Sequence, residues 1–143
     1  ERDRVLSWIE LSAGEVLAGG AVDHNGLLQP TVIANPAPTD KLQCDEVFGP
    51  VVTLTRVASL DEAIEQANAT RYGLQAAIFT RDLSRALSTA QRLEFGGVTV
   101  NEAPTFRADQ MPYGGVKDSG NTKEGPAWAV REMTEERLVV LQL

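Results

Sequence analysis

Apolar and polar residues follow a helical period at the start of the chain and then a turn pattern. Residues 4–20, RVLSWIELSAGEVLAGG, carry their apolar side chains at positions close to one helix face. These are Val5, Trp8, Ile9, Val16 and Leu17. The spacing predicts one helix that runs up to Gly19-Gly20. The next segment, AVDHNGLLQPTVIANP, predicts a β-hairpin, because HNG tolerates positive φ and β-branched residues follow it.

After Pro50 the pattern changes to strands that alternate with helices. Strand-like runs occupy residues 51–57, 73–80 and 98–101, and helix-like segments lie between them, at 59–70 and 81–97. Two βαβ units with short connections nearly always make right-handed crossovers and a parallel sheet. The sequence therefore predicts an α/β fold built on a parallel βαβαβ sheet.

Both predicted helices of this region have a recognisable start. Ser59 and Glu62 form a capping box, in which each side chain satisfies the backbone N–H of the other. Asp82 is the expected N-cap of the second helix, and Gly96-Gly97 the exit from it. One apolar face is predicted for that helix, with the residues Leu83, Ala86, Leu87 and Ala90.

The last third of the chain begins with a long loop. Residues 102–121 contain three glycines and two prolines and no clear periodicity, and loops of this length in compact domains are usually functional. We expect a helix at about 123–133, with Pro126 in its first turn, and a final strand at 136–143. The region before this loop gives no internal repeat and no linker, so we expect a single domain over 1–143.

Composition and charge narrow the class of protein. The 143 residues are 43% apolar and 23% charged, as in ordinary globular proteins, and carry a net charge of −7. A phosphate backbone is repelled by that charge, so we expect no nucleic-acid partner. No apolar run approaches the ~20 residues that cross a bilayer. With no signal-peptide pattern and one cysteine, we expect a cytoplasmic protein; the first residue, Glu1, suggests processing or a piece of a longer chain.

Obvious reactive residues give weak signals. Cys44 precedes Asp45 and Glu46, carboxylates that do not stabilise a thiolate, so a structural turn is favoured over a nucleophile. The adjacent carboxylates point opposite ways in an extended segment and make no acid–base pair. His24 lies in the HNG turn, and one histidine is poor grounds for a metal site. GGVKDSG has neither of the usual phosphate-loop spacings.

Position in the predicted sheet is a better guide to a ligand site than residue type. Ligands of open parallel sheets bind beyond the carboxyl ends of the strands. Asn101 ends the third predicted strand, and the loop 102–121 begins at that edge. The residues alone thus indicate an α/β domain with a ligand loop and leave its function open.

Several motifs in fixed order carry a resemblance to a known family. EVFGPVV, NATRYGLQAAIFTRDLSRAL, GGVTVN and MPYGGVKDSG resemble the C-terminal part of the aldehyde dehydrogenase superfamily, and the likeness covers nearly the whole chain. The resemblance implies NAD or NADP as cofactor. It implies that Glu46 hydrogen-bonds the nicotinamide-ribose hydroxyls and that Phe48 packs beside the ribose and nicotinamide. The family's catalytic thiol lies upstream of these motifs, so Cys44 is not at its position.

The same resemblance assigns the long loop to the substrate. Tyr113, in the PYGG motif, corresponds to an aromatic residue that lines the aldehyde pocket. Arg107 stands where many members carry another aromatic residue, which implies an aldehyde with an anionic or strongly polar tail. A solvated loop arginine is the alternative. SGNTKEG departs from the family's usual Gly-Arg-Glu run, and Lys123 keeps the charge without the fork geometry.

Two functional hypotheses remain from the sequence. In the first, the chain is part of an aldehyde dehydrogenase, contributes cofactor contacts and pocket wall, and is inactive alone. In the second, it is a non-catalytic oligomerisation or binding module that associates through exposed sheet edges. The strand 136–143 would belong to the oligomerisation element, and a homo-oligomer is expected in either case.

Overall fold

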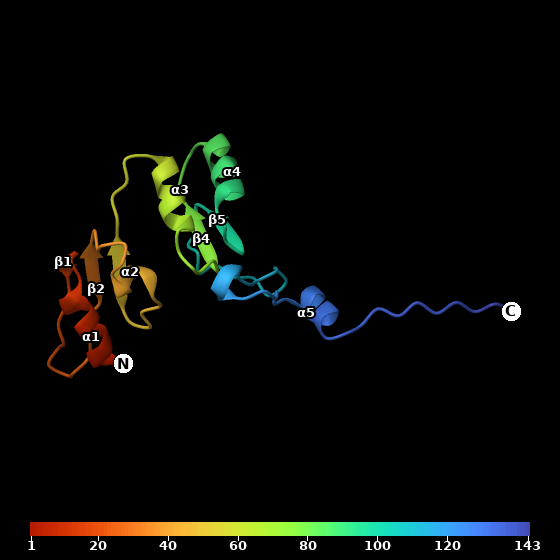
Figure 1. Ribbon diagram of the computed structural model, residues 1–143, viewed down its shortest axis with the longest axis horizontal. Coiled ribbons are helices and arrows are strands. Elements are labelled where there is room, and N and C mark those ends of the chain that lie inside the picture. The colour runs from red at the N-terminus through yellow and green to blue at the C-terminus, as the bar shows by residue number, and fades with distance from the viewer. The chain divides into compact units, whose positions relative to one another are not determined.

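The computed structural model describes residues 1–143, which form two compact units (Figure 1). The N-terminal unit comprises Glu1–Leu60 and the C-terminal unit Asp61–Leu143. The boundary between the two units, after Leu60, lies within the first half of the sequence for which a single domain is expected.

The N-terminal unit is a helix packed on a three-stranded sheet. Helix α1 (Arg2–Leu11) precedes β1 (Glu15–Ala18), β2 (Thr31–Ala34), the one-turn helix α2 (Lys41–Cys44) and β3 (Val51–Leu54). The strand order is β1-β2-β3, with β1 antiparallel and β3 parallel to β2. The core consists of apolar side chains from α1, β2 and α2, which are Val5, Ile9, Ile33 and Leu42.

The predicted long first helix is wrong beyond Leu11. Its period is broken at Ser12, whose backbone is extended and whose Oγ donates to Oδ2 of Asp40 at 2.7 Å. At Gly14 the chain passes so close to Ile33 that a Cβ would lie 2.4 Å from its Cγ2. The segment therefore leaves the helix and joins the sheet as β1. The apolar residues Val16 and Leu17, which fit the helical pattern, lie in this strand instead.

The predicted hairpin is confirmed in its turn and second strand, whereas its first strand, β1, lies before residue 21, in the segment predicted as helix. Strands β1 and β2 pair antiparallel, and an isolated bridge joins Val22 to Leu28 near the turn. Gly26 has φ of +81°, and Oδ1 of Asp23 accepts hydrogen bonds from the backbone of Asn25 and Leu27, each at 2.9 Å. An aspartate that bonds the backbone two residues on, followed by a glycine at positive φ, is a locally encoded turn.

The first part of the C-terminal unit contains two helices and two parallel strands. Helix α3 (Leu60–Asn68) leads to β4 (Gln75–Ile78), and α4 (Leu83–Arg92) connects β4 to β5 (Gly97–Val100). The two strands pair in parallel, from Gln75 opposite Gly97 to Ile78 opposite Val100. This is the strand–helix–strand unit that the alternating pattern predicts.

The α/β class and the parallel pairing are confirmed, but the three predicted strands do not form one continuous sheet. Strand β3 is hydrogen-bonded to β2, whereas β4 is hydrogen-bonded to β5 in a separate two-stranded sheet. Element type depends on local pattern, whereas strand pairing depends on distant partners that the pattern does not specify.

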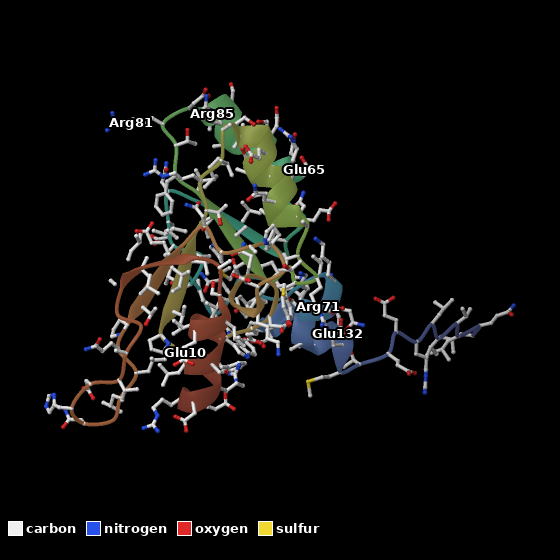
Figure 2. All side chains as sticks on the ribbon, turned by 60° about the vertical axis from the view of Figure 1, so that its left-hand side comes forward. Glu10, Glu65, Arg71, Arg81, Arg85 and Glu132 are labelled. Carbon is white, nitrogen blue, oxygen red and sulfur yellow. The ribbon has the colours of Figure 1, made fainter.

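Helix α4 confirms its predicted cap and contradicts part of its predicted face. Oδ1 of Asp82 accepts a hydrogen bond from the backbone N–H of Arg85 at 3.0 Å. Ala86 is buried, but Leu83 and Leu87 are 72% and 58% exposed. Arg81 and Arg85 project outward at the start of the helix (Figure 2). The capping box at Ser59 and Glu62 stays a prediction.

The end of the chain is shorter in regular structure than predicted. A 3₁₀ turn, η1 (Lys117–Ser119), interrupts the long loop, and helix α5 (Pro126–Glu132) begins with its proline. Residues 134–143 form neither helix nor strand, so the predicted strand 136–143 is wrong for this structure. A strand needs a neighbour for its N–H and C=O groups, and this segment pairs with none in the chain.

Candidate functional site

The segment between α2 and β3 presents two side chains to solvent and partly buries the one between them. Val47 packs against the core cluster of the N-terminal unit, whereas Glu46 is exposed and Phe48 is 77% exposed. No hydrogen bond or ion pair engages the Glu46 carboxylate within the chain. An exposed carboxylate and an exposed aromatic ring two residues apart are available to a ligand.

The backbone at Phe48 is unusual. Its φ is +48°, in the left-handed region that bulky residues rarely adopt. Gly49 follows it, at a point where a Cβ would lie 3.2 Å from Val5 on α1. Such a conformation persists only where surrounding packing enforces it, and it is common at ligand sites.

Asp40 joins the loops at one end of the N-terminal unit. Its Oδ2 accepts hydrogen bonds from Oγ of Ser12 at 2.7 Å and from the backbone N–H groups of Ala13 and Ala37, each at 3.1 Å. The hydrogen bond from Ser12 is the main cause that lowers the pKa of Asp40 from its ordinary 3.8, opposed by desolvation. This clamp fixes the start of α2, which leads into Glu46–Phe48.

Cys44 and His24 have local surroundings. Sγ of Cys44 lies 3.7 Å from the carbonyl oxygen of Thr39, its weak hydrogen-bond acceptor. The His24 ring is 3.1 Å from the side-chain amide of Asn25 in the hairpin turn. Nowhere do three or more histidine, cysteine or acidic side chains gather so that they could hold a metal ion. Neither residue stands in a catalytic arrangement.

Arg107 and Tyr113 lie together on the long loop of the C-terminal unit. The guanidinium carbon of Arg107 is 4.6 Å from the centre of the Tyr113 ring, and its Nη2 donates to Oε2 of Glu124 at 2.7 Å. The backbone of Glu124 in turn bridges to that of Tyr113, with N–H donors in both directions. The three residues form one cluster, with the arginine held between a ring and a carboxylate.

The other end of this loop is fastened to the connection between α3 and β4. Arg71, labelled in Figure 2, donates from Nε to Asp118 at 2.6 Å. Nζ of Lys117 donates to the carbonyl of Asn68 at 2.7 Å, at the end of α3. Oγ of Ser119 accepts from the backbone of Gly73 at 3.0 Å. These bonds restrain the loop at η1.

Asn101, expected to lie beside a ligand site, has a structural role: its side chain bonds the backbone next to β4. Its Oδ1 accepts from the backbone N–H of Thr80 at 2.8 Å, and its Nδ2 donates to the carbonyl of Thr80 at 2.9 Å. The side chain thereby continues the pairing of β4 and β5 past their ends. It leaves loop 102–121 to start from a fixed point.

The structure thus brings Arg107 and Tyr113 together and exposes Glu46 and Phe48, with the first pair in one unit and the second in the other.

Two residues that contact these predicted sites, Glu124 and Arg4, were not identified from the sequence. Glu124 lies in the SGNTKEG run, whose departure from the family pattern drew attention only to Lys123. Arg4 donates from Nη2 to the carbonyl of Val47 at 2.7 Å, and no motif marks it.

No helix of the chain has the length and apolarity needed to cross a bilayer.

Comparisons with known proteins agree on one family. The profile of the aldehyde dehydrogenase family matches residues 1–139. The chain is 44% identical to the 3-sulfolactaldehyde dehydrogenase of Priestia aryabhattai over 145 aligned positions, which cover 100% of the chain and 30% of that protein. It is 45% identical to a lactaldehyde dehydrogenase of Methanococcus maripaludis, over 90% of the chain and 27% of that protein.

A solved structure supports the same assignment. The glyceraldehyde-3-phosphate dehydrogenase GapN of Methanocaldococcus jannaschii, complexed with NADP, matches with a TM-score of 0.85 at 40% identity. That match covers 92% of this chain and 29% of the other. The chain spans about 30% of the length of the curated relatives it matches. It belongs to the aldehyde dehydrogenase family.

Proposed function

We propose that this chain acts as the C-terminal part of an NAD(P)-dependent aldehyde dehydrogenase, which oxidises an aldehyde to a carboxylic acid. Family membership over residues 1–139 and the names of the relatives support the reaction class. The observation within the chain that carries the proposal is the presentation of Glu46 and Phe48 on either side of the inward-facing Val47. That arrangement suits a ligand with both hydroxyl groups and a flat ring.

Glu46 and Phe48 would bind the nicotinamide half of the cofactor. An ionised carboxylate accepts hydrogen bonds from two neighbouring ribose hydroxyls, and charge-assisted bonds of this kind are the stronger ones. The Phe48 ring offers an apolar face to the ribose and the nicotinamide. The cofactor supplies the hydride acceptor. NADP is bound by one structural relative, and both NAD and NADP fit this role.

Arg107 and Tyr113 would form wall of the aldehyde pocket. The guanidinium suits a carboxylate, sulfonate or phosphate tail, because its planar fork can make two parallel hydrogen bonds. Two relatives are named for a sulfonated and a phosphorylated aldehyde, which favours an anionic tail. Another is named for lactaldehyde, which is neutral, so a hydroxyaldehyde is the competing substrate class.

The reaction needs a nucleophile from outside these residues. Cys44 contacts a backbone carbonyl and no histidine or cationic side chain that would activate it. Thiolate attack on the aldehyde, hydride transfer to the cofactor and hydrolysis of the thioester therefore require a cysteine that this chain does not supply. The 143 residues alone would be inactive, and the enzyme would act as a cytoplasmic homo-oligomer.

A second candidate function is a non-catalytic association module. Its support is the exposed apolar surface of the last residues, which comprise Leu138, Val139, Val140, Leu141 and Leu143. Unpaired backbone beside apolar side chains favours pairing with another chain. In this hypothesis Glu46 and Phe48 have no ligand.

An assay of the full-length protein that contains this chain separates the two functions. Aldehyde-dependent reduction of NAD or NADP would be followed by the absorbance of the reduced nicotinamide, with wild type, Glu46→Gln and Phe48→Ala. The enzyme hypothesis expects turnover in wild type and weaker cofactor binding in both variants, at an unchanged Tm. Turnover that is absent with every aldehyde class, or cofactor binding that ignores both substitutions, would contradict it.

A further inference from the structure

We propose that Arg4, on α1, is a positioning residue for the cofactor-binding segment Glu46–Phe48. The proposal rests on the function proposed above for that segment. It adds a residue 43 positions upstream in the sequence, on another element of the same unit. Arg4 would act through the backbone and would not touch the cofactor.

Arg4 is held in place on one side and bonded to the segment on the other. Its guanidinium carbon lies 4.3 Å from the centre of the Trp8 ring, one turn further along α1. Its Nη2 donates to the carbonyl oxygen of Val47 at 2.7 Å, in a partly buried position. Its Nε donates to Oε2 of Glu1 at 2.8 Å, an ion pair with the residue that precedes α1, as the Nε of Arg2 pairs with Asp3. The side chain of Arg4 is 33% exposed. Stacking on the indole restricts the guanidinium, so the hydrogen bond costs less conformational entropy than one from a free arginine.

The accepting carbonyl belongs to the peptide plane that sets the conformation of Phe48. The carbonyl oxygen of Val47 and the nitrogen of Phe48 lie in one rigid unit, so fixing the oxygen restricts rotation about φ of Phe48. That φ is +48°, a conformation that a phenylalanine leaves readily unless something restrains it. A charged donor on this carbonyl is such a restraint.

Apolar packing against α1 also holds the segment Glu46–Phe48 in place. Val47 contacts the cluster that contains Val5, and Gly49 passes close to Val5 as well. The helix therefore holds the segment at the residue between the two proposed ligand contacts and again just after them. Loss of the Arg4 bond would leave the apolar packing in place and free mainly the peptide of Phe48.

Arg2 provides a matched control on the same helix. Its Nη1 donates to the carbonyl of Gly26 at 3.1 Å, in the hairpin turn, and its Nε bonds Asp3. Arg2 thus has the same side chain, the same helix and the same kind of bond to a distant backbone carbonyl. It differs in the segment that it restrains.

The test compares Arg4→Met, Arg4→Lys and Arg2→Met in the full-length protein. Methionine keeps apolar packing on Trp8 and removes the donor. Arg4 does not touch the cofactor, so only part of the energy of a hydrogen bond from a charged group should appear in binding, and we expect the Kd for NAD or NADP to rise about 3- to 30-fold in Arg4→Met. Lysine retains a donor and would restore part of the affinity. Arg2→Met would leave the Kd unchanged, and the aldehyde KM would stay constant in all three.

Titration of the cofactor by isothermal calorimetry, together with Tm and steady-state kinetics, gives the readout. Equal Kd values in wild type and Arg4→Met would overturn the proposal, as would an equal loss in Arg2→Met. If Arg4→Met fails to fold, Arg4→Lys decides by the same comparison with Arg2→Met: a Kd raised above the wild-type value supports positioning by the guanidinium, and a wild-type Kd excludes it. Phe48→Ala separates the two levels: if it leaves the Kd unchanged the proposed function fails, whereas if it alone raises the Kd only the role of Arg4 fails.

Discussion

Arg107 is bonded to Glu124 at 2.7 Å while its guanidinium stacks on the Tyr113 ring. The arginine therefore carries a counter-charge before any substrate arrives. If Arg107 binds an anionic tail as proposed, that tail would share the remaining N–H groups or displace the Glu124 carboxylate. Both side chains of the ion pair are about half exposed, at 47% and 62%, and exposed pairs contribute only about 0–1 kcal/mol. The ion pair between Arg107 and Glu124 is therefore weak enough for a better-placed anion to displace the Glu124 carboxylate.

Replacing Arg107 by leucine should change substrate preference in the full-length protein. A hydrogen bond to a charged group is worth about 1.5–3 kcal/mol, and half exposure of Arg107 favours the lower end. We expect kcat/KM for an aldehyde with a carboxylate, sulfonate or phosphate tail to fall roughly 10-fold. A simple aliphatic aldehyde should react equally well or better. Steady-state kinetics with one aldehyde of each kind measures the difference.

The control for this prediction is Arg107→Lys, which keeps the charge without the fork. Partial recovery with the anionic aldehyde would attribute the effect to charge, and full recovery would show that the fork is not needed. The Kd for the cofactor should not move in either variant, because Glu46 and Phe48 are unchanged. An equal loss with both aldehydes would make Arg107 a structural residue of the loop.

Cys44→Ser in the full-length protein should leave turnover nearly unchanged. The thiol ends a one-turn helix and makes only a weak contact with the carbonyl of Thr39, which a hydroxyl can reproduce. We expect kcat within about twofold of wild type, since ΔΔG‡ for a bystander is small against 1.36 kcal/mol per tenfold. A fall of several orders of magnitude would identify Cys44 as the nucleophile and reverse its assignment here.

The 143-residue chain alone should self-associate. Apolar residues stay exposed over 138–143, and Leu83 and Leu87 are exposed on α4, so burial against a second chain removes much apolar surface from water. Sedimentation velocity at low and high concentration would detect this. Val140→Asp, in the middle of the last segment, should shift the distribution toward monomer, whereas Glu136→Gln should not. A monomer at every concentration would refute the exposed-segment argument.

How far the sequence predicts this structure depends on the distance over which each feature is determined. The Asp82 cap and the Asp23–Gly26 turn involve residues within four positions of one another, and both were predictable. The bond between Arg107 and Glu124 spans 17 positions, and that between Arg4 and Val47 spans 43. Neither leaves a periodic signal.

The errors have a related cause. Val16 and Leu17 fit a helix face in the sequence, but Gly14 and the Ser12–Asp40 bond divert the chain into a strand. The apolar pattern of 136–143 suits a strand, and a strand forms only beside a partner. Leu83 and Leu87 are predicted on an apolar helix face but are exposed. An apolar face predicts that another element covers it, but the pattern does not say which element.

Asp40 should make the N-terminal unit sensitive to acid. Its folded-state pKa is lowered, chiefly by the hydrogen bond from Ser12, so the ionised form is favoured in the native state. A carboxyl group with a lowered native pKa contributes stability that is present above its unfolded value. That contribution is lost as the pH falls below about 4, toward the folded-state pKa.

Asp40→Asn isolates this contribution, because the amide retains a carbonyl acceptor but not the charge. Glu1 and Asp3 also have lowered pKa values, and they titrate alike in both proteins, so their effect cancels in the difference. We expect Asp40→Asn to lower Tm by a constant amount between pH 5 and pH 7, the range above the ordinary pKa of 3.8. The difference should shrink as the pH falls below about 4, where wild type loses the charge as well. Thermal unfolding followed by circular dichroism across this pH range makes the measurement. A gap in Tm that stays constant down to pH 3, about one unit below that ordinary value, would show that the carboxylate charge contributes nothing to the clamp between Ser12 and Ala37.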